Sequence, residues 1–308
     1  MKTLMATDGS SYAMAALTTA ARLLTRKDNR FDVICVVPEF QSAPDLKKTN
    51  RKDTKEFRKR YYDYMEQNGG RLLKRATEAL QANGIAAHSF AKTGSAGDVL
   101  VSLGEDYDVV VVGAQGRTER PSPGLGPVAS RVVEHVGGTV LVGRELVNES
   151  NFKILVAVDG SARSRNAIEA LMSNFNLDGA QVTLMHVIEK PWLRLNLEQE
   201  WYAELQRAYA AESPEKAEAE ELFGTELRRE AEQIIEDARD MLRPSEVSTD
   251  ARIEEGIPGN ELLHEAEIGD YDLAVVGATG VSDLKHTMLG SVAFKLAWTA
   301  PCSVAIVR

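Results

Sequence analysis

The sequence predicts an α/β protein of two tandem domains, each an open five-stranded parallel sheet with helices on both faces. One reason is an internal repeat: KTLMATDGSSYAMAAL from Lys2 aligns without gaps with KILVAVDGSARSRNAI from Lys153. The 39 residues from Asp106 to Arg144 also align with Asp270 to Arg308, with 14 identities. The other reason is that short β-rich runs alternate with helical stretches in each half, as in parallel sheets.

The second repeat shows this alternation most clearly. Its predicted strands are KILVAVD, AQVTLMHVIE, VSTDARIEEG, DLAVVGA and CSVAIVR. Helices are predicted in SARSRNAIEALMSNF, in PGNELLHEAEIG, which opens at Pro258, and from Gly290 to Trp298. A charged segment from Leu197 to Leu242 also has helical spacing, and Ser213-Pro214 is expected to interrupt it.

The chain length fits two domains, since 308 residues is long for a single core. The polar junction NESN, residues 148–151, separates the repeats. We therefore expect domains at residues 1–147 and 151–308, called the first half and the second half below.

Composition narrows the class of protein. The net charge of -10 opposes a general nucleic-acid partner. No apolar run approaches the ~18 residues that span a bilayer, and MKTLMATDGS does not resemble a signal peptide. We expect a cytoplasmic protein with no membrane partner. Cys35 and Cys302 lie in apolar runs and are predicted to be buried, reduced thiols.

Two features follow predicted strands in both halves, at the edge where ligands of open parallel sheets bind. The first is Asp-Gly-Ser, at residues 8–10 and 159–161. The second is a glycine loop, GATGVSDLKHTMLGS from Gly277, which is matched by GAQGRTERPSPGLGP from Gly113. Asp and Ser also favour helix N-caps and Gly favours turns, so a purely structural interpretation of both features stays open.

The loop of the second half has the properties of a phosphate-binding loop. Gly277 and Gly280 let backbone N–H groups approach an anion closely because they lack Cβ. Gly290-Ser291 opens a helix whose free N–H groups and dipole attract negative charge. Lys285 and His286, within the loop, are either cations near phosphate or exposed side chains without a ligand.

The spacing Gly, two residues, Gly, nine residues, Gly, Ser closely resembles the ATP-binding signature of the universal stress protein family. The resemblance covers nearly the whole chain as two family domains, except for insertions at residues 39–70 and 190–224. It implies Rossmann-like, adenine nucleotide α-hydrolase-like domains that pair through their last strands. We therefore expect GGTVLVGRE to lie antiparallel to CSVAIVR in an internal pseudo-dimer, and a homodimer of the chain stays open.

In ATP-binding members of the family, the Asp after the first strand approaches the ribose and metal region, and residues around the second strand enclose adenine. Carried over by position, the resemblance implies a site for ATP and Mg²⁺ in the second half, with Asp159 nearest the metal. Its residues would be Ala157, Asp159, Val187, Val276, Gly277, Gly280, Gly290, Ser291 and Val292.

The first half departs from this pattern at one position. It supplies Ala6, Asp8, Val37, Val112, Gly113, Gly116 and Gly126, but it has Pro127 where the family has Ser or Thr. Proline removes a backbone N–H and a hydroxyl together, although it suits the first turn of a helix. The sequence therefore disfavours ATP binding in the first half, where Arg117 and Arg120 offer replacement charge.

These observations predict a stress-response regulator that binds ATP in its C-terminal domain, with at most slow hydrolysis or self-phosphorylation, since no catalytic base and nucleophile stand out. The alternatives are a non-nucleotide scaffold or small-ligand binder, and an enzyme of the adenine nucleotide α-hydrolase class. His186 is predicted to be a hydrogen-bonded strand histidine, and Trp298 to pack on the last helix. Attraction between basic Lys47–Arg60 and acidic Glu198–Glu230 is an assembly hypothesis.

Overall fold

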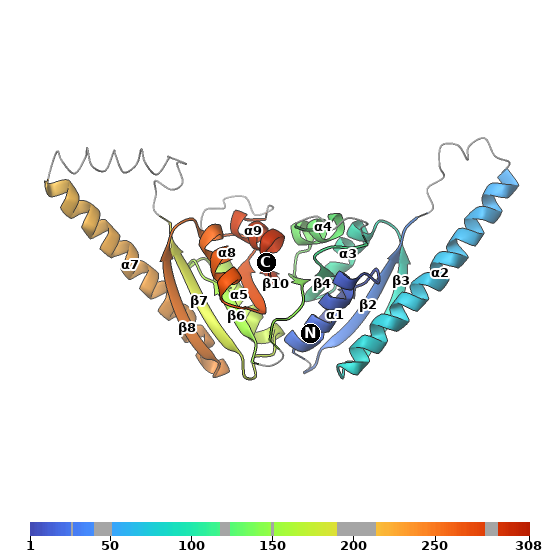
Figure 1. The fold of residues 1–308 in the computed structure, drawn as a ribbon, viewed down its shortest axis with the longest axis horizontal. Coiled ribbons are helices and arrows are strands. Elements are labelled where there is room, and N and C mark those ends of the chain that lie inside the picture. The colour runs from blue at the N-terminus through green and yellow to red at the C-terminus, as the bar shows by residue number, and fades with distance from the viewer. Residues whose placement is uncertain (26, 40–50, 118–123, 149–150, 190–213, 281–288) are drawn as a thin grey trace.

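The computed structural model describes residues 1–25, 27–39, 51–117, 124–148, 151–189, 214–280 and 289–308, with the backbone alone at 51–54 and 214–223. The described strands form one ten-stranded sheet in the order β3-β2-β1-β4-β5-β10-β9-β6-β7-β8 (Figure 1). In the first half they are β1 (Lys2–Ala6), β2 (Arg30–Val37), β3 (Ala87–Thr93), β4 (Val109–Gly113) and β5 (Thr139–Gly143). In the second half they are β6 (Lys153–Ala157), β7 (Gln181–Ile188), β8 (Ser248–Glu255), β9 (Leu273–Gly277) and β10 (Ser303–Val307).

Helices cover both faces of this sheet. They are α1 (Ser11–Leu23), α2 (Arg51–Ala82), α3 (Ala96–Gly104), α4 (Pro127–His135), α5 (Ala162–Asn174), α7 (Pro214–Leu242), α8 (Pro258–Ile268) and α9 (Ser291–Thr299), with a short 3-10 turn, η3 (Arg243–Ser245). One apolar layer joins α1, α2, α5 and α7 to the strands, and a second joins α3, α4, α8 and α9 to them. Both layers contain residues of both halves, so the halves share a continuous core on each face.

The two halves are joined at the middle of the sheet by their last strands. β5 and β10 run antiparallel, with Val142 opposite Val304 and Val140 opposite Ile306, whereas the other described strand pairs are parallel. The antiparallel pairing predicted for these segments is therefore confirmed. In the first half the chain runs outward from β1 to β2 and β3 on one side, and β4 then pairs with β1 on the other side. In the second half β7 and β8 lie on one side of β6, and β9 lies on the other. The strand order therefore reverses at β1 and at β6, which the Asp-Gly-Ser turns follow, as predicted.

A buried carboxylate anchors the junction between the halves. Asp272 has no exposed surface, and its side chain accepts hydrogen bonds from the backbone N–H groups of Val147, Asn148 and Lys153 at 2.8 to 3.0 Å. The side-chain amide of Asn148 donates a further bond of 2.8 Å. Four donors thus hold both sides of the junction against the start of β9.

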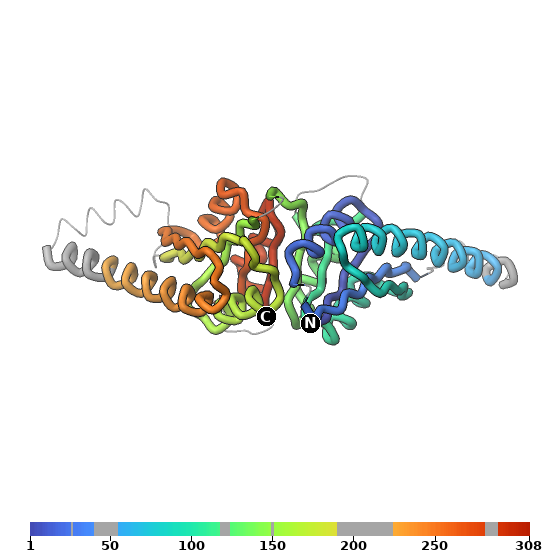
Figure 2. Tube along the Cα trace, turned by 90° about the horizontal axis from the view of Figure 1, so that it is seen from below, coloured from blue at the N-terminus to red at the C-terminus, as the bar shows by residue number. Residues whose placement is uncertain are grey.

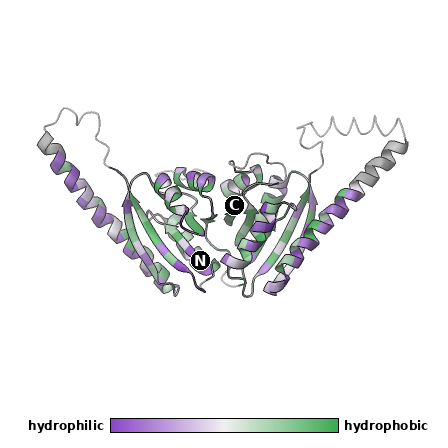
Figure 3. Ribbon diagram, turned by 180° about the vertical axis from the view of Figure 1, so that it is seen from behind, coloured by the Kyte–Doolittle hydropathy of each residue, from purple (hydrophilic) through white to green (hydrophobic). Residues whose placement is uncertain are grey.

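The two long helices lie at opposite ends of the molecule. α2 packs on β2 and β3, and α7 packs on β7 and β8. Each helix extends beyond the sheet at its N-terminal end, and hydrophilic residues predominate there, where the side chains are described (Figures 2 and 3). α7 begins at Pro214, where the sequence predicts a break, because proline suits a first helical turn.

The described parts of the insertions do not support their attraction within one chain, because α2 and α7 are separated by the width of the sheet. Attraction between two chains stays a hypothesis. The aromatic residues of the second insertion, Trp192, Trp201 and Tyr202, lie outside the described residues. In the described part of the chain, no helix combines the length and the apolar character needed to cross a membrane.

Candidate functional site

The loops after β6 and β9 meet at the carboxyl edge of the second half. A Cβ placed on Gly280 would lie 2.6 Å from Oδ2 of Asp159, and one placed on Gly277 would lie 3.0 Å from the backbone of Arg163. The N–H of Gly290 donates to the carbonyl of Ala278 at 2.7 Å, which closes the loop onto the start of α9. The structure therefore brings Asp159, Gly277, Gly280 and Gly290 together, and we call this arrangement the cradle. Glycine is required where its segments are closest.

Helix α9 presents its first turn to this cradle. Gly290 is its N-cap, and no side chain of the described residues caps the helix. Ser291 is the first helical residue and is exposed, and Val292 follows it. The first N–H groups of a helix have no partner within it, so this end offers donors and the positive pole of the helix dipole.

The Asp-Gly-Ser turn is built as a helix start as well as a site. Ser161 caps α5 by accepting from the N–H of Ser164 at 3.1 Å, and Asp159 accepts from the N–H of Ser161 at 3.0 Å through Oδ1. Gly160 has a φ of 74°, a left-handed conformation that favours glycine. Its position also lies against Ile234 of α7, so the long helix covers this turn, a contact that the sequence did not indicate.

The apolar residues proposed to enclose a base lie beside the cradle. Ala157 is half-buried, and Val187 and Val276 are buried in the apolar cluster that Ala157 contacts. The ring of His186 lies 2.8 Å from the carbonyl of Val158 through Nδ1, so Nδ1 carries the hydrogen. The predicted hydrogen-bonded strand histidine is thereby confirmed, and its bond fixes the end of β7 beside the Asp159 turn.

The first half repeats the same backbone arrangement. A Cβ on Gly116 would lie 2.9 Å from Oδ2 of Asp8, and the N–H of Gly126 donates to the carbonyl of Ala114 at 2.8 Å. Asp8 also accepts from the N–H of Arg117 at 2.9 Å. A Cβ on Gly113 would meet the backbone of α1 at 2.8 Å. The cradle itself is therefore preserved in both halves.

The halves differ in what surrounds the cradle. Pro127 is the first residue of α4, and the helix forms normally after it, as the sequence predicts. This helix start lacks the N–H and the hydroxyl that Ser291 provides in the second half. Nη2 of Arg117 would lie 2.9 Å from a Cβ on Gly9, so this guanidinium covers the Asp-Gly-Ser turn. Arg120, like Lys285 and His286 of the second loop, lies outside the described residues.

Among the residues that the structure describes, the titratable groups near the two loops form no metal cluster of their own. In the described part of the chain, no three His, Cys, Asp or Glu side chains gather as metal ligands. Cys35 and Cys302 are buried free thiols, as predicted. Burial is the main cause that raises the pKa of Cys35, followed by the charge of Asp8, and Arg117 lowers it.

The fold and these loops define a class: tandem α/β domains of Rossmann type, each with an aspartate turn and a glycine loop at the point where strand order reverses. The model of the Universal stress protein family matches residues 1–144 and 151–308. The chain belongs to this family, and it contains two copies of the family domain in tandem.

Known relatives are similar over one or both copies. A universal stress protein of Bacillus subtilis is 30% identical over 156 residues, which cover 51% of this chain and 98% of that protein. One of Methanocaldococcus jannaschii is 27% identical over 157 residues, which cover 51% of this chain and 81% of that protein. The crystal structure of a universal stress protein from Archaeoglobus fulgidus shares the fold across 100% of this chain and 98% of that one, with a TM-score of 0.61 and 18% identity.

Proposed function

We propose that the protein is a cytoplasmic stress-response regulator that binds ATP together with Mg²⁺ in its second half. The observation that carries the proposal is the start of α9, where exposed Ser291 and N–H groups that no described side chain caps adjoin the cradle of Asp159 and Gly280. A triphosphate is an anion with several acceptor oxygens, and a helix start beside a glycine loop suits it on both counts.

Each part of the site takes one part of the nucleotide in this proposal. The phosphates accept from the N–H groups of Ser291 and Val292 and from the Ser291 hydroxyl. The adenine contacts the apolar edge formed by Ala157, Val187 and Val276. Asp159 is the carboxylate that would hold Mg²⁺, and the ion supplies charge neutralisation for the phosphates when it is bound.

The first half does not bind ATP in this proposal. Its glycine cradle matches that of the second half, so the difference lies at the helix start, where Pro127 offers neither donor. The antiparallel seam of β5 and β10 then takes the place of a dimer interface, as in a pseudo-dimer. The two buried free cysteines fit a reducing compartment such as the cytoplasm.

Regulation rather than turnover is the expected use of the site. The residues described around it are positioning groups: glycine backbone, a helix start, a hydroxyl and one carboxylate. Phosphoryl transfer depends on positioning and charge, so slow hydrolysis or self-phosphorylation is compatible with these groups. A scaffold that binds no nucleotide is the alternative, in which the loops serve only as turns and helix starts.

Calorimetric titration of the whole chain with ATP and Mg²⁺ tests the proposal. We expect a stoichiometry near one, and loss of binding in the double variant Gly290→Ala with Ser291→Ala. The matched control is Gly126→Ala with Pro127→Ala in the first half, which should leave the affinity unchanged. Two equal sites would contradict the assignment to the second half, and no binding would favour the scaffold. Many turnovers in a phosphate-release assay would instead indicate an enzyme.

A further inference from the structure

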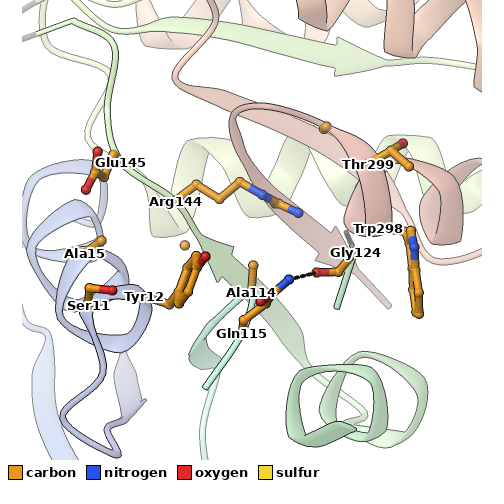
Figure 4. A pocket seen from close by; sticks show the side chains of 12 residues that line it. Ser11, Tyr12, Ala15, Ala114, Gln115, Gly124, Arg144, Glu145, Trp298 and Thr299 are labelled. Atoms are coloured by element: carbon orange, nitrogen blue, oxygen red, sulfur yellow. Dashed lines mark hydrogen bonds between the residues drawn. The ribbon is translucent and has the colours of Figure 1, made fainter. Parts of the chain in front are cut away.

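A second candidate site lies between the two halves and includes residues from both ends of the glycine loop of the first half. A pocket of about 660 Å³ is lined by the start of α1, the loop after β4, the residues at the end of β5, and the C-terminal end of α9. Figure 4 shows Tyr12 and Trp298 on opposite sides of it, with Gln115 and Gly124 between them. Pockets for small organic ligands have volumes of about 300 to 1,000 Å³, so this one has room for such a ligand.

The pocket contains a half-buried cation, Arg144, whose side chain donates to backbone carbonyls. The Arg144 guanidinium is half-buried and donates to the carbonyls of Cys302 at 3.1 Å and Ala297 at 2.6 Å. A guanidinium has five N–H donors, and these two bonds use two of them. Burial lowers the pKa of Arg144. An anion placed beside the guanidinium would stabilise its charged form.

The walls beside this cation are aromatic and apolar. Trp298 is half-buried, and a Cβ on Gly124 would lie 2.1 Å from its Nε1, so the ring lies directly against the loop of the first half. Gln115 donates from Nε2 to the carbonyl of Gly124 at 3.2 Å, which ties Gly124 to the end of β4. Ala15 and Ala114, which also line the pocket, have small side chains.

The internal repeat shows that this combination belongs to one side of the seam alone. The residues that correspond to Tyr12, Trp298 and Arg144 in the other copy are Arg163, Glu134 and Arg308. Burial lowers the pKa of Arg308, and the charge of nearby Arg163 lowers it further. The equivalent position thus has charged groups in place of both rings, and the aromatic pocket is specific to the side formed by α1 and α9.

We propose that this pocket binds a small aromatic carboxylate, with its carboxylate on the Arg144 guanidinium and its ring system between Tyr12 and Trp298. A carboxylate matches a guanidinium in geometry, and two parallel N–H···O bonds form where donors are available. The single negative charge is favoured over a phosphate because Glu145 stands exposed at the pocket and would repel a dianion more strongly.

This site is separate from the one proposed for ATP. None of the residues assigned to nucleotide binding in either half lines the pocket. It is also built from both halves, since Trp298 belongs to the second half and the other wall to the first. Its ligand therefore contacts the seam directly and favours the joined arrangement of the halves.

Titration calorimetry of the whole chain with 2-naphthoate tests the proposal, with 2-naphthalenemethanol as the neutral probe of the same shape. We expect one molecule of naphthoate per chain and at least tenfold weaker binding of the alcohol. Arg144→Gln should weaken naphthoate binding by about tenfold or more and leave the alcohol unaffected, since a hydrogen bond to a charged group is lost.

Two controls keep this result specific. Arg308→Gln removes the corresponding arginine outside the pocket and should leave the naphthoate affinity within about twofold. The double variant Tyr12→Leu with Trp298→Leu retains Arg144 and should weaken both probes, which tests the rings even where Arg144→Gln impairs folding.

Several outcomes would overturn the proposal. They are absence of naphthoate binding, equal binding of the two probes, equal loss in Arg144→Gln and Arg308→Gln, or full binding in the double leucine variant. Displacement of naphthoate by saturating ATP with Mg²⁺ would place the probe in the nucleotide site instead. A chain that binds naphthoate but no ATP would contradict the proposed function and leave this inference standing.

Discussion

Arg144 and Arg308 hold the two halves together reciprocally, each at the C-terminal end of the other half's last helix. Nη2 of Arg144 donates to the carbonyl of Ala297 in α9 at 2.6 Å, and Nη2 of Arg308 donates to the carbonyl of Val133 in α4 at 2.7 Å. Arg308 also donates to the carbonyls of Glu134 and Val136. A cation at this end satisfies free carbonyls and the negative pole of the helix dipole.

Removing the second of these arginines should destabilise the joined chain. Arg308→Gln loses charged donors to carbonyls across the seam, and we expect the free energy of unfolding to fall by about 1.5 to 3 kcal/mol. Urea denaturation measures this change. The control is Arg131→Gln, because Arg131 lies on α4 and forms an exposed ion pair with Asp98 of α3. Its loss should cost under about 1 kcal/mol. Equal losses of unfolding free energy in the two variants would show that the hydrogen bonds across the seam stabilise the chain no more than an exposed ion pair does.

A single substitution at the start of α9 should remove the same phosphate donors that the first half lacks. Ser291→Pro removes an N–H and a hydroxyl at the start of α9 but suits a first helical turn, as Pro127 does in α4. We expect ATP affinity to fall at least about tenfold while the thermal midpoint changes little. Calorimetry and thermal denaturation measure the two effects, and Pro127→Ser is the control that should keep the second site intact. Unchanged affinity in Ser291→Pro would rule out this helix start as the phosphate site.

A methyl group at Gly280 should disturb the proposed site through its aspartate. The added Cβ would lie 2.6 Å from Oδ2 of Asp159, closer than any ordinary contact, so the carboxylate must move. We expect Gly280→Ala to weaken ATP binding. Gly116→Ala makes the matching change beside Asp8, at 2.9 Å, and should leave ATP binding as it was. A result in which both variants bind ATP equally well would separate Asp159 from the nucleotide.

The buried carboxylate at the junction should matter more for stability than its counterpart in the first repeat. Asp272→Ala leaves four donors without their acceptor, and we expect a loss of about 2 to 4 kcal/mol in the free energy of unfolding. The counterpart Asp108 is exposed and accepts from the N–H of Lys2, so Asp108→Ala should cost less. Denaturant unfolding of both variants measures the difference, and a larger loss for Asp108→Ala would contradict it.

Stability should decline in alkali because of Tyr271. Burial, followed by the hydrogen bond to Glu265, raises the pKa of its phenol from 10.0 to about 12. The unfolded chain therefore loses this proton before the folded chain does, so the stabilisation is complete below pH 10 and is lost as the pH rises toward 12. Tyr271→Phe should flatten this part of the profile of unfolding free energy against pH. Tyr64→Phe, at a side chain that is 61% exposed, should leave the slope unchanged.

The fold was predictable because the sequence contains two aligned copies of the same pattern of strands and helices. Alternating apolar runs predict the strands, and the aligned copies predict that the same order recurs, which the sheet confirms. The antiparallel seam followed only from the family resemblance, since a pattern of apolar residues does not reveal which strand edges meet. Asp272 was missed because a buried acid and an exposed one look alike in a sequence, and the Asp-Tyr-Asp of the two copies is identical.

The sites were predictable to different degrees. Glycine spacing indicated that the loop after β9 approaches Asp159, and the structure places Gly280 directly against that carboxylate. The pocket at the seam gave no such signal, since Tyr12, Arg144 and Trp298 are far apart in the chain and meet only across two halves. Trp298 was expected to pack on its helix, and it does stack on Phe294 with ring centroids 5.4 Å apart, but it also forms a wall of the pocket.

The central position of the seam sets an order of events during synthesis. β5 emerges from the ribosome as an apolar edge strand, and its partner β10 lies at Ser303–Val307, almost a whole domain later. At synthesis rates of about 5 to 20 residues per second, this edge stays open for roughly ten to thirty seconds. During that interval the nascent first half presents the unpaired edge of β5 to any neighbouring chain. We therefore expect mispairing between copies to begin on polysomes, where several nascent chains lie close together.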